Sequence, residues 1–371
     1  MISELIVSPE DLRDFSRAVL RGMAMPLDHV EIVSAALLDA DLRGIDTHGA
    51  VRLPQYVTLI KGGVINPRPE IKVITESFSH VLLDGGYGLG FLGSVKAMSL
   101  CIEKVKQAGI GLAGVRNSSH FGAAGYYARM AAEQDLIGFA TSNSYPMMAP
   151  PGSLVRTHGN NPLSFAIPAG ERPPIVLDMA TSVVSQGRIK KYATEGRQIP
   201  VGWAYDKEGK PTDDPGAAIS LVPLGESGYK GYGMAVVMDA LAGVLTGSIF
   251  ARNFVSGPGS LGCGHLFMAL DPQLFMSRDE FKRRMDEMIG QIKDVQRPDG
   301  AKGPVYLPGE RGSEREQKGL KEGIPMLAST IGLLDKLADE LGLSRLKRNG
   351  PYSARPQKSE ELATSRTKPR P

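Results

Sequence analysis

Three side chains with catalytic potential lie four residues apart near the N-terminus: His48, Arg52 and Tyr56. If residues 48–56 form a helix, the three share one face, because residues at this spacing are neighbours on a helix surface. Imidazole exchanges a proton near neutral pH, and guanidinium holds a carboxylate through two hydrogen bonds. Together these groups would suit hydride transfer to or from a small hydroxy or keto acid. The alternative is a polar turn capped by Thr47, with His48 at the surface.

A second histidine, His120, lies in the sequence Arg-Asn-Ser-Ser-His-Phe-Gly at residues 116–122. We expect a strand to end and a helix to begin here, so backbone N–H groups would point outward and suit an anion. His120 is therefore the rival candidate for proton transfer, or a cofactor contact. A role in capping the helix is an equally good interpretation.

Three more polar stretches follow at expected strand ends or helix starts. Asn143 and Ser144 lie among amides and prolines that could form a ligand wall. Asp178 precedes small residues, and its carboxylate could orient an imidazole and stabilise the cationic form, or cap a helix. Lys230, in Gly-Tyr-Lys-Gly-Tyr-Gly, lies beside amides that would suit a phosphate, although a solvated lysine is the commoner outcome.

Gly88, Gly90 and Gly93 form a G-x-G-x-x-G pattern before an expected helix. This pattern is the dinucleotide-binding fingerprint when an acid about 20 residues further on holds the ribose. Here Arg116 ends the next expected strand; an arginine could suit a 2′-phosphate. We favour the other interpretation, a glycine-rich turn with close packing of helix and strand.

Hydrophobic periodicity predicts the elements that must position these groups. Two helices are expected within 9–43, the second opened by a capping pattern of Asp28 and Glu31, and another helix over 50–61 in which Pro54 disfavours a straight axis. From residue 70 short strands alternate with helices, which predicts an α/β body. The expected strands are 71–75, 80–84, 110–115, 136–142, 163–167, 174–178 and 265–270; the expected helices are 93–108, 123–134, 182–193, 231–245, 278–294 and 325–341, with a charged loop around 303–322.

Composition excludes several classes of function. The chain has 43 basic and 40 acidic residues, and the excess lies in a Pro/Ser/Lys/Arg-rich tail after residue 350, which we expect to be disordered. The remaining body is neutral and gives no case for nucleic acid. Cys101 and Cys263 cannot form a disulfide framework or a Cys-ligated zinc site, and no signal peptide or membrane span is evident. We expect a cytoplasmic protein without a metal site.

In their joint order these motifs resemble the malate/L-lactate dehydrogenase family, which includes ureidoglycolate and sulfolactate dehydrogenases, 2,3-diketogulonate reductase and Δ1-piperideine-2-carboxylate reductase. The motifs are Asp-Thr-His-Gly with the following Arg52, Asn-Ser-Ser-His-Phe-Gly-Ala-Ala-Gly-Tyr-Tyr, Asn-Asn-Pro-Leu, Leu-Asp-Met-Ala-Thr-Ser, Ile-Pro-Val-Gly-Trp-Ala-Tyr-Asp and Gly-Tyr-Lys-Gly-Tyr-Gly. The resemblance runs from about residue 5 to 340.

The resemblance implies an α/β fold that binds NAD(P) without a Rossmann fold. It implies a helical N-terminal module over 1–69, a cofactor-binding body over 70–323, and a C-terminal helix over 324–349 that packs back on the N-terminal module, before the tail at 350–371. Family members are commonly homodimers with the active site near the subunit interface. Residues 156–161 read Arg-Thr-His-Gly-Asn-Asn, where the family more often shows Gly-Thr-Asn or Gly-Asn-Asn, so we expect this loop to shape substrate preference.

The resemblance also implies roles for individual residues. The acid/base is His48 or His120, with Thr47 in place of the commoner serine, and Asp178 is a relay or cofactor contact. Arg52 holds the substrate carboxylate, and we expect Tyr56 and Asn143 beside it. The residues expected to contact the dinucleotide are His120, Phe121, Gly122, Ser144, Asp178, Met179, Ala180, Lys230, Gly309, Glu310 and Arg311.

The implied activity is hydride transfer between NAD(P)H and a small 2-keto or 2-hydroxy carboxylate of the malate or lactate kind. The sequence does not decide between NAD and NADP. The same groups could reduce a cyclic imino acid such as Δ1-piperideine-2-carboxylate or Δ1-pyrroline-2-carboxylate, because an imine also needs a hydride, a proton and an anchored carboxylate. A remote alternative is a regulator that binds the cofactor without turnover; intact His48, Arg52, His120 and Lys230 argue against it.

Overall fold

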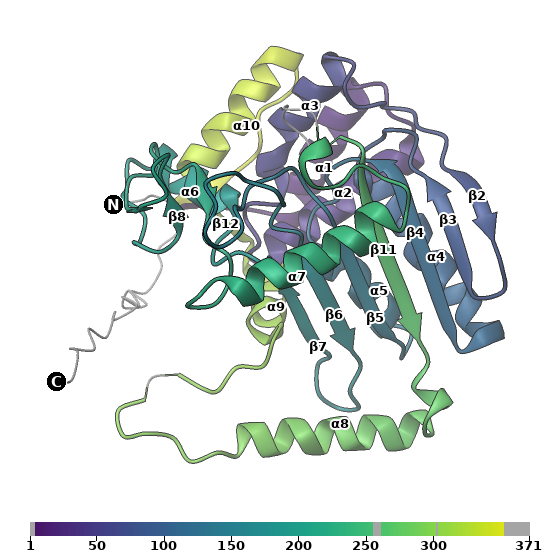
Figure 1. The fold of residues 1–371 in the computed structure, drawn as a ribbon. Helices are drawn as coiled ribbons and strands as arrows, with labels where there is room; N and C mark the ends of the chain where they lie inside the picture. The colour runs from purple at the N-terminus through teal and green to yellow at the C-terminus, as the bar shows by residue number, and fades with distance from the viewer. Residues whose placement is uncertain (1–3, 255–260, 302, 352–371) are drawn as a thin grey trace.

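A seven-stranded sheet forms the centre of the computed structural model, which describes residues 4–254, 261–301 and 303–351 (Figure 1). Its strand order is β2 (Lys72–Glu76), β3 (His80–Asp84), β4 (Ile110–Ser118), β11 (Cys263–Leu270), β5 (Ile137–Ser142), β6 (Leu163–Ile167) and β7 (Ile175–Met179). Only the β3–β4 pair in this sheet is parallel, and the five other pairs are antiparallel. A Rossmann fold requires a mainly parallel sheet, so the expected non-Rossmann α/β fold is confirmed.

Helices α4 (Gly90–Ala108) and α5 (Ala124–Ala132) cover the face of the sheet that lies behind it in Figure 1. The buried side of α5 is rich in alanine, and with residues of α4 and Phe267 of β11 it forms one hydrophobic core. On the front, α7 (Tyr229–Asp239) crosses the strands and continues as a π-helical turn, η2 (Ala240–Val244), where a single α-helix was expected. The expected helices and strands of the body are thus confirmed with small shifts of their ends.

The first and last segments of the described chain share a second core. Helices α1 (Pro9–Gly22), α2 (Leu27–Leu42) and α3 (Leu53–Lys61) pack with α10 (Ala328–Leu341). Strand β1 (Glu4–Val7) pairs with β12 (Ile324–Leu327) on one side and β13 (Asn349–Pro351) on the other. The expected capping by Asp28 is wrong: α2 begins after Pro26 without a side-chain cap, and Asp28 lies in its first turn.

A short helix and a small sheet extend from the end of β7. Helix α6 (Gln186–Thr194) packs against β10 (Ser220–Leu221), β8 (Ala204–Tyr205) and β9 (Pro211–Thr212) around Met148, Ile189 and Leu221. The two-residue strands had no periodic signal and were not expected. The segment from Asp178 to Gly187 connects the large sheet to α6, and it passes through the candidate site described below.

Two helices follow the large sheet near the C-terminal end. Helix α8 (Arg278–Lys293) was expected, but the loop expected around 303–322 is wrong over most of its length, because residues 310–322 form α9 (Glu310–Glu322). Helix α9 buries only one of its thirteen residues, Gly319. Because its sequence has no apolar stripe, the hydrophobic pattern did not predict a helix there.

The first two residues of the expected tail at 350–371 belong to a strand, since Asn349–Pro351 form β13; residues 352–371 lie outside the described part of the chain. Within the described residues, no helix has the length and apolar character that a bilayer span requires. Nor do the described residues contain a cluster of His, Cys, Asp and Glu side chains that could hold a metal ion.

Candidate active site

His48 lies in the turn between α2 and the 3-10 helix η1 (Ala50–Arg52). It therefore precedes the helical residues, although a helix over 48–56 was expected to include it. Asp41, at the end of α2, accepts a hydrogen bond from the Ala50 N–H (2.8 Å) and so fixes this turn. A Cβ on Gly49 would overlap the Asp41 carboxylate, so only glycine allows the close approach. The expected common helix face is therefore wrong for His48, while Arg52 and Tyr56 do follow on η1 and α3.

The two candidate histidines nevertheless meet. The rings of His48 and His120 are stacked, with centroids 5.4 Å apart and planes inclined by 24°. Tyr56, fully buried, places its hydroxyl 2.8 Å from Nδ1 of His120, and the Gly122 N–H donates to the same nitrogen over 3.4 Å. Because Nδ1 accepts from an amide, the neutral imidazole of His120 carries its proton on Nε2.

The glycine-rich pattern at residues 88–93 positions His120. Gly90 N donates to the His120 carbonyl (3.2 Å), and a Cβ on Gly90 would overlap the Ser119 carbonyl oxygen. Ser119 Oγ donates in turn to the Gly88 carbonyl (2.9 Å). The pattern is thus a close-packed turn that fixes the histidine segment, as the favoured interpretation had it.

Arg52 is half-buried beside the histidines. Its Nε donates to the Thr47 carbonyl (2.6 Å), and Nη1 donates to Gln55 Oε1 (3.0 Å). Nη2 has no acceptor within the described residues and lies beside Gly187 at the start of α6. Thr47 Oγ1 lies 2.9 Å from Nδ1 of His48. One edge of the guanidinium is therefore held by the protein, and another donor is left for an anionic ligand.

Both histidines are uncharged in this arrangement. Burial, followed by the positive charge of Arg52, lowers the pKa of His48 to about 3. Burial, then Arg52, then His48 hold the pKa of His120 well below its usual value. A carboxylate bound at Arg52 would cancel the main positive charge near both rings, and would raise both pKa values towards the neutral range in which proton transfer is effective.

Asp178 is the second-last residue of β7 and is exposed in the structure. Its Oδ2 accepts a hydrogen bond from Gly125 N in the first turn of α5 (2.8 Å), just after the His120 segment. Desolvation by the surrounding protein raises the pKa of Asp178 to about 6, and the Gly125 N–H opposes that shift. From the sequence, this carboxylate was expected either to orient an imidazole or to cap a helix. The contact that it makes is with the start of a helix and not with an imidazole.

The residues after Asp178 join the histidine cluster to a second group of polar residues. Thr181 N donates to the Asn160 carbonyl (2.9 Å), and Leu224 N donates to the Thr181 carbonyl (2.9 Å). Gly231, in the first turn of α7, packs so closely that a Cβ there would overlap the same Thr181 carbonyl oxygen. Ser144 belongs to the same group, with its N–H donating to Asn161 Oδ1 (3.0 Å). We call the surface formed by Ser144, Asn160 and Thr181 the cofactor wall.

The two helices that begin at this wall present free donors. Lys230, in the first turn of α7, is exposed, and neither its Nζ nor its N–H has a partner among the described residues. Helix α9 starts against β7, where Val176 N donates to the Pro308 carbonyl (3.0 Å). Arg311, at that start, stacks its guanidinium over the Tyr306 ring at 4.4 Å. Glu310 is committed instead to Lys293 (2.5 Å) and to the Leu307 N–H (2.9 Å).

These donors fit an anionic dinucleotide. Two helix N-termini, an unpaired ammonium group and an exposed guanidinium lie along β7 and the segment after it: α9 starts beside Val176, and the first turn of α7 packs on Thr181. The carboxylate of Asp178 lies at the same strand end, where it could accept from a ribose or amide group. The expected cofactor residues from Ser144 to Arg311 therefore lie on neighbouring elements, with Glu310 acting as a support.

Asn143 belongs neither to the histidine cluster nor to the cofactor wall. Its amide nitrogen donates to Asp239 Oδ1 (2.7 Å) and the Ile249 carbonyl (2.6 Å), and its oxygen accepts from Gly264 N (2.8 Å). Both donor hydrogens are used inside the protein, so the expected substrate contact is replaced by a structural network. His158, in the loop expected to shape substrate preference, joins this network with Nε2 3.7 Å from Asp239 Oδ2 and its ring edge-on to Tyr232.

One polar residue beside the site had no signal in the sequence. His265 lies on the central strand β11 with no exposed surface, and its ring stacks on Phe121 at 4.7 Å with an interplanar angle of 2°. A single histidine in an apolar strand is more often a core residue than a functional one. Only the strand order, which places β11 between β4 and β5, brings it under the His120 segment.

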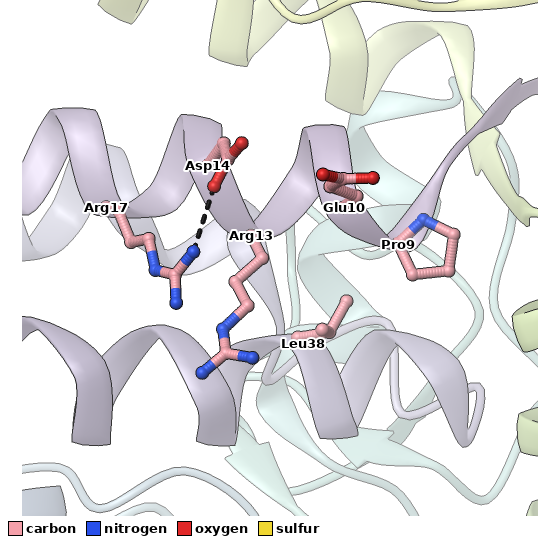
Figure 2. Close-up of a pocket in the computed structure, with 6 residues that line it drawn as sticks. All are labelled: Pro9, Glu10, Arg13, Asp14, Arg17 and Leu38. Atoms are coloured by element: carbon pink, nitrogen blue, oxygen red, sulfur yellow. Dashed lines mark hydrogen bonds and ion pairs between the residues drawn. The ribbon is translucent and has the colours of Figure 1, made fainter.

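A hollow of about 330 Å³ lies elsewhere, between α1 and α2 (Figure 2). Of its charged side chains, Arg17 pairs with Asp14 (3.0 Å, Figure 2), and Arg13 pairs with Glu31 of α2 (3.0 Å). None of the expected site residues lines it.

Comparison with known proteins places the chain among dehydrogenases. The model of the family described as malate/L-lactate dehydrogenase matches residues 7–335. Malate dehydrogenase of Pyrococcus abyssi is 40% identical over 352 residues, which cover 92% of this chain and 96% of that protein. The crystal structure of malate dehydrogenase from Entamoeba histolytica superposes with a TM-score of 0.87 at 31% identity, covering 92% of this chain and 99% of the other.

Other similar proteins differ in cofactor and substrate. Ureidoglycolate dehydrogenase (NAD(+)) of Escherichia coli K12 is 31% identical over 86% of this chain and 92% of its own length. (2R)-3-sulfolactate dehydrogenase (NADP(+)) of Chromohalobacter salexigens is 33% identical over 73% and 82%. The structure of Δ1-piperideine-2-carboxylate reductase from Pseudomonas syringae has a TM-score of 0.81 at 28% identity, covering 90% of this chain and 99% of the other.

Proposed function

The chain belongs to the malate/L-lactate dehydrogenase family, and we propose that it transfers a hydride between NAD(P) and a small 2-hydroxy or 2-keto carboxylate through the cluster of His48, His120 and Arg52. The observation that carries this proposal is the stacking of two neutral imidazoles 5.4 Å apart beside a guanidinium with a free donor. A proton exchanger and a carboxylate anchor are the two groups that such a reaction requires from the protein.

Arg52 binds the substrate carboxylate through Nη2, because Nε and Nη1 are held by Thr47 and Gln55. That contact fixes the α-carbon and places the hydroxyl or keto oxygen near the stacked imidazoles. Its second effect is electrostatic, since neutralising Arg52 removes a charge that lowers the pKa of both histidines. Substrate binding thereby prepares the imidazoles to take up a proton.

His120 exchanges the proton, with His48 as the rival. Once charged, the ring gives its Nε2 proton to the substrate oxygen in reduction and keeps hydrogen on Nδ1, and in oxidation it takes the proton back at Nε2. Tyr56 serves both charge states of the His120 ring: its hydroxyl donates to Nδ1 of the neutral ring and accepts from Nδ1–H of the cation. Thr47 Oγ1 stands in the same relation to Nδ1 of His48. NAD(P)H, when bound, supplies the hydride, and NAD(P)⁺ accepts it in the reverse direction.

The residues that would hold the dinucleotide are those of the wall at the end of β7. Lys230 and the N-terminal amides of α7 and α9 would bind its phosphates, with Ser144, Asp178, Met179 and Ala180 lining the wall. Phe121 and Gly122 follow His120 directly and would lie beside the reacting end. Arg311, at the start of α9, is free to meet a further phosphate or ribose group.

The activity is tested by following NAD(P)H absorbance with purified protein and a panel of oxaloacetate, pyruvate, sulfopyruvate and Δ1-piperideine-2-carboxylate. Oxidation of the cofactor by a keto acid supports the proposal. Faster oxidation by the cyclic imine favours the alternative, which the similarity to a piperideine-2-carboxylate reductase supports. Quenching of cofactor fluorescence without turnover of any substrate would leave a binding protein and end the proposal.

His48→Asn and His120→Asn separate the two proton exchangers. Asparagine retains a polar group of similar size at the position of Nδ1 but cannot take up a proton at neutral pH. Loss of turnover by two or more orders of magnitude is expected for the variant at the exchanging residue. Unchanged turnover in either variant removes that residue from the scheme.

We infer a homodimer from the exposed side of the α7–η2 helix. Gly233, Val237, Ala240 and Val244 are all exposed and recur every three or four residues, so they form one uncharged stripe; Val237 and Val244 expose 53% and 56% of their surface. The stripe continues from the helix turn that carries Lys230, so a second copy packed on it would lie near the active site. Val237→Lys with Val244→Lys should give a monomer in light scattering, while Val201→Lys, at a 70% exposed position elsewhere, should not.

We further infer a cytoplasmic location and the three-part organisation at 1–69, 70–323 and 324–349. Cys101 and Cys263 are buried free thiols, which suits a reducing compartment. The shared core of α1, α2, α3 and α10 supports a unit made from both chain ends, and Leu89, Phe91 and Leu92 of the body pack into it. Fractionation of the source cells and limited proteolysis at residues 62–70 and 322–324 test these two inferences.

A further inference from the structure

His265 is the one fully buried histidine among the described residues, and both of its ring nitrogens are hydrogen-bonded. Nδ1 lies 2.8 Å from Ser142 Oγ at the end of β5, and Nε2 lies 2.8 Å from Ser118 Oγ at the end of β4. The imidazole therefore bridges the ends of the two strands that flank β11. A leucine would fill this space at lower desolvation cost, so the polar bridge calls for an explanation.

The direction of the two hydrogen bonds follows from counting protons. Ser142 Oγ has one hydrogen and lies within hydrogen-bond distance of the Asn143 carbonyl (2.9 Å), the Gly264 carbonyl (3.2 Å) and His265 Nδ1 (2.8 Å). We assign this hydrogen to a carbonyl, so that Ser142 accepts from His265 Nδ1–H and Nε2 accepts from the Ser118 hydroxyl. Burial lowers the pKa of His265 to about 3, so the ring stays neutral at every working pH.

Each bridged serine leads into one half of the candidate active site. Ser118 precedes Ser119 and His120 by one and two residues, and the next residue, Phe121, stacks on the His265 ring. Tyr127 holds the same segment by donating from its hydroxyl to the Phe121 carbonyl. Ser142 precedes Ser144, the first residue of the cofactor wall, by two residues. One imidazole thus touches both segments.

We infer that His265 is a positioning residue, which holds the His120 segment and the Ser144 segment in fixed relation through its two hydrogen bonds and its stacking on Phe121. The inference rests on the proposed function, in which these segments carry proton exchange and cofactor binding. His265 contacts neither substrate nor cofactor. It affects catalysis by fixing the geometry of the two segments that contact the substrate and the cofactor.

Two serine variants divide the effect. Ser118→Ala frees the His120 segment, so kcat should fall about fivefold to tenfold while the NAD(P)H dissociation constant stays within twofold. Ser142→Ala frees the cofactor segment, so the dissociation constant should rise about fivefold to tenfold while kcat at saturating cofactor stays within twofold. Ser16→Ala, a buried serine of α1 that donates to the Leu12 carbonyl (2.8 Å), is the matched control and should change neither quantity.

Two substitutions of the histidine itself test the assigned donor and acceptor. His265→Asn can keep a donor near the position of Nδ1 and so the bond to Ser142, and it should reproduce the Ser118→Ala pattern. His265→Gln can keep an acceptor near the position of Nε2 and so the bond to Ser118, and it should reproduce the Ser142→Ala pattern. Cofactor binding is read by fluorescence titration of folded protein, so the split is measured independently of turnover.

The outcomes distinguish this inference from the proposed function. If the unmodified protein turns over no carboxylate with NAD(P)H, the proposed function fails and the fluorescence titrations alone test the cofactor half. If the unmodified protein is active but Ser118→Ala and Ser142→Ala each lower kcat and cofactor affinity together, or neither changes them, His265 is a core residue and the inference is overturned.

Discussion

Replacing Tyr56 with phenylalanine removes one hydroxyl from the buried floor of the active site and leaves the ring in place. That hydroxyl is 2.8 Å from Nδ1 of His120 and is the only side-chain partner of this imidazole nitrogen among the described residues. The phenyl ring would keep its edge-on contact with Phe91, so packing is preserved. The variant therefore tests the hydrogen bond and not the volume.

The expected magnitude follows from which charge state the hydroxyl supports. It accepts from Nδ1–H when His120 is a cation, and a hydrogen bond to a charged group contributes about 1.5–3 kcal/mol. We expect kcat to fall about 10- to 100-fold, since a factor of ten corresponds to about 1.4 kcal/mol. The pKa of His120 is already held low by burial and by Arg52, and the loss of an acceptor for the cation lowers it further.

Initial rates of NAD(P)H oxidation, measured across a pH range at saturating substrate, check this prediction. The limb of the profile that reports the proton exchanger should move to lower pH in Tyr56→Phe, while the Michaelis constant for the substrate changes little. A variant with unchanged kcat and an unshifted profile would refute the role given to His120 and leave His48 as the exchanger.

Three further changes are predicted. Arg52→Gln should raise the Michaelis constant for the carboxylate about 100-fold or more, with cofactor affinity retained, because Nη2 is its free donor; equal loss of cofactor affinity would contradict the assignment. Gly90→Ala should lower both thermal stability and kcat, because the added Cβ would overlap the Ser119 carbonyl oxygen and displace His120. Unchanged thermal stability would show that the backbone of the turn moves to accommodate the Cβ, which would contradict this prediction. Burial raises the pKa of Asp41 to about 7 from a usual 3.8, so the folded protein keeps a proton that the unfolded chain releases, and stability falls as pH rises between these values. The asparagine of Asp41→Asn does not titrate, so between pH 5 and pH 8 the free energy of unfolding of the unmodified protein should fall relative to that of the variant by about 3 kcal/mol at most. Parallel pH dependence of the two proteins in denaturant unfolding would contradict the burial of this carboxyl.

Local pattern was sufficient for most of the elements and for the motifs. Helices α1, α4 and α8 and the strands of the large sheet carry the apolar periodicity that defines them, and the positions of His48, Arg52 and His120 stand out because of their neighbours. Helix α9 was missed because it buries only Gly319 and its polar side chains make ion pairs, such as Glu316 with Arg43, so no apolar stripe marks it.

Long-range relations could not be read in this way. His48 and His120 stack although 72 positions separate them, and nothing local to either residue specifies that contact. The same is true of His265, whose partners Ser118 and Ser142 are brought to it only by the placement of β11 between β4 and β5. Asn143 shows the converse error: an amide at a strand end suggested a ligand contact, but three internal partners use it.

A crystal structure of the protein with NAD(P)⁺ and malate tests the central claim most directly. We predict the substrate carboxylate within hydrogen-bond distance of Arg52, its hydroxyl within reach of Nε2 of His120 or a ring nitrogen of His48, and the dinucleotide phosphates at Lys230 and the starts of α7 and α9. A dinucleotide bound along the glycine-rich turn at residues 85–93, or a substrate that avoids Arg52 and both histidines, would contradict the account.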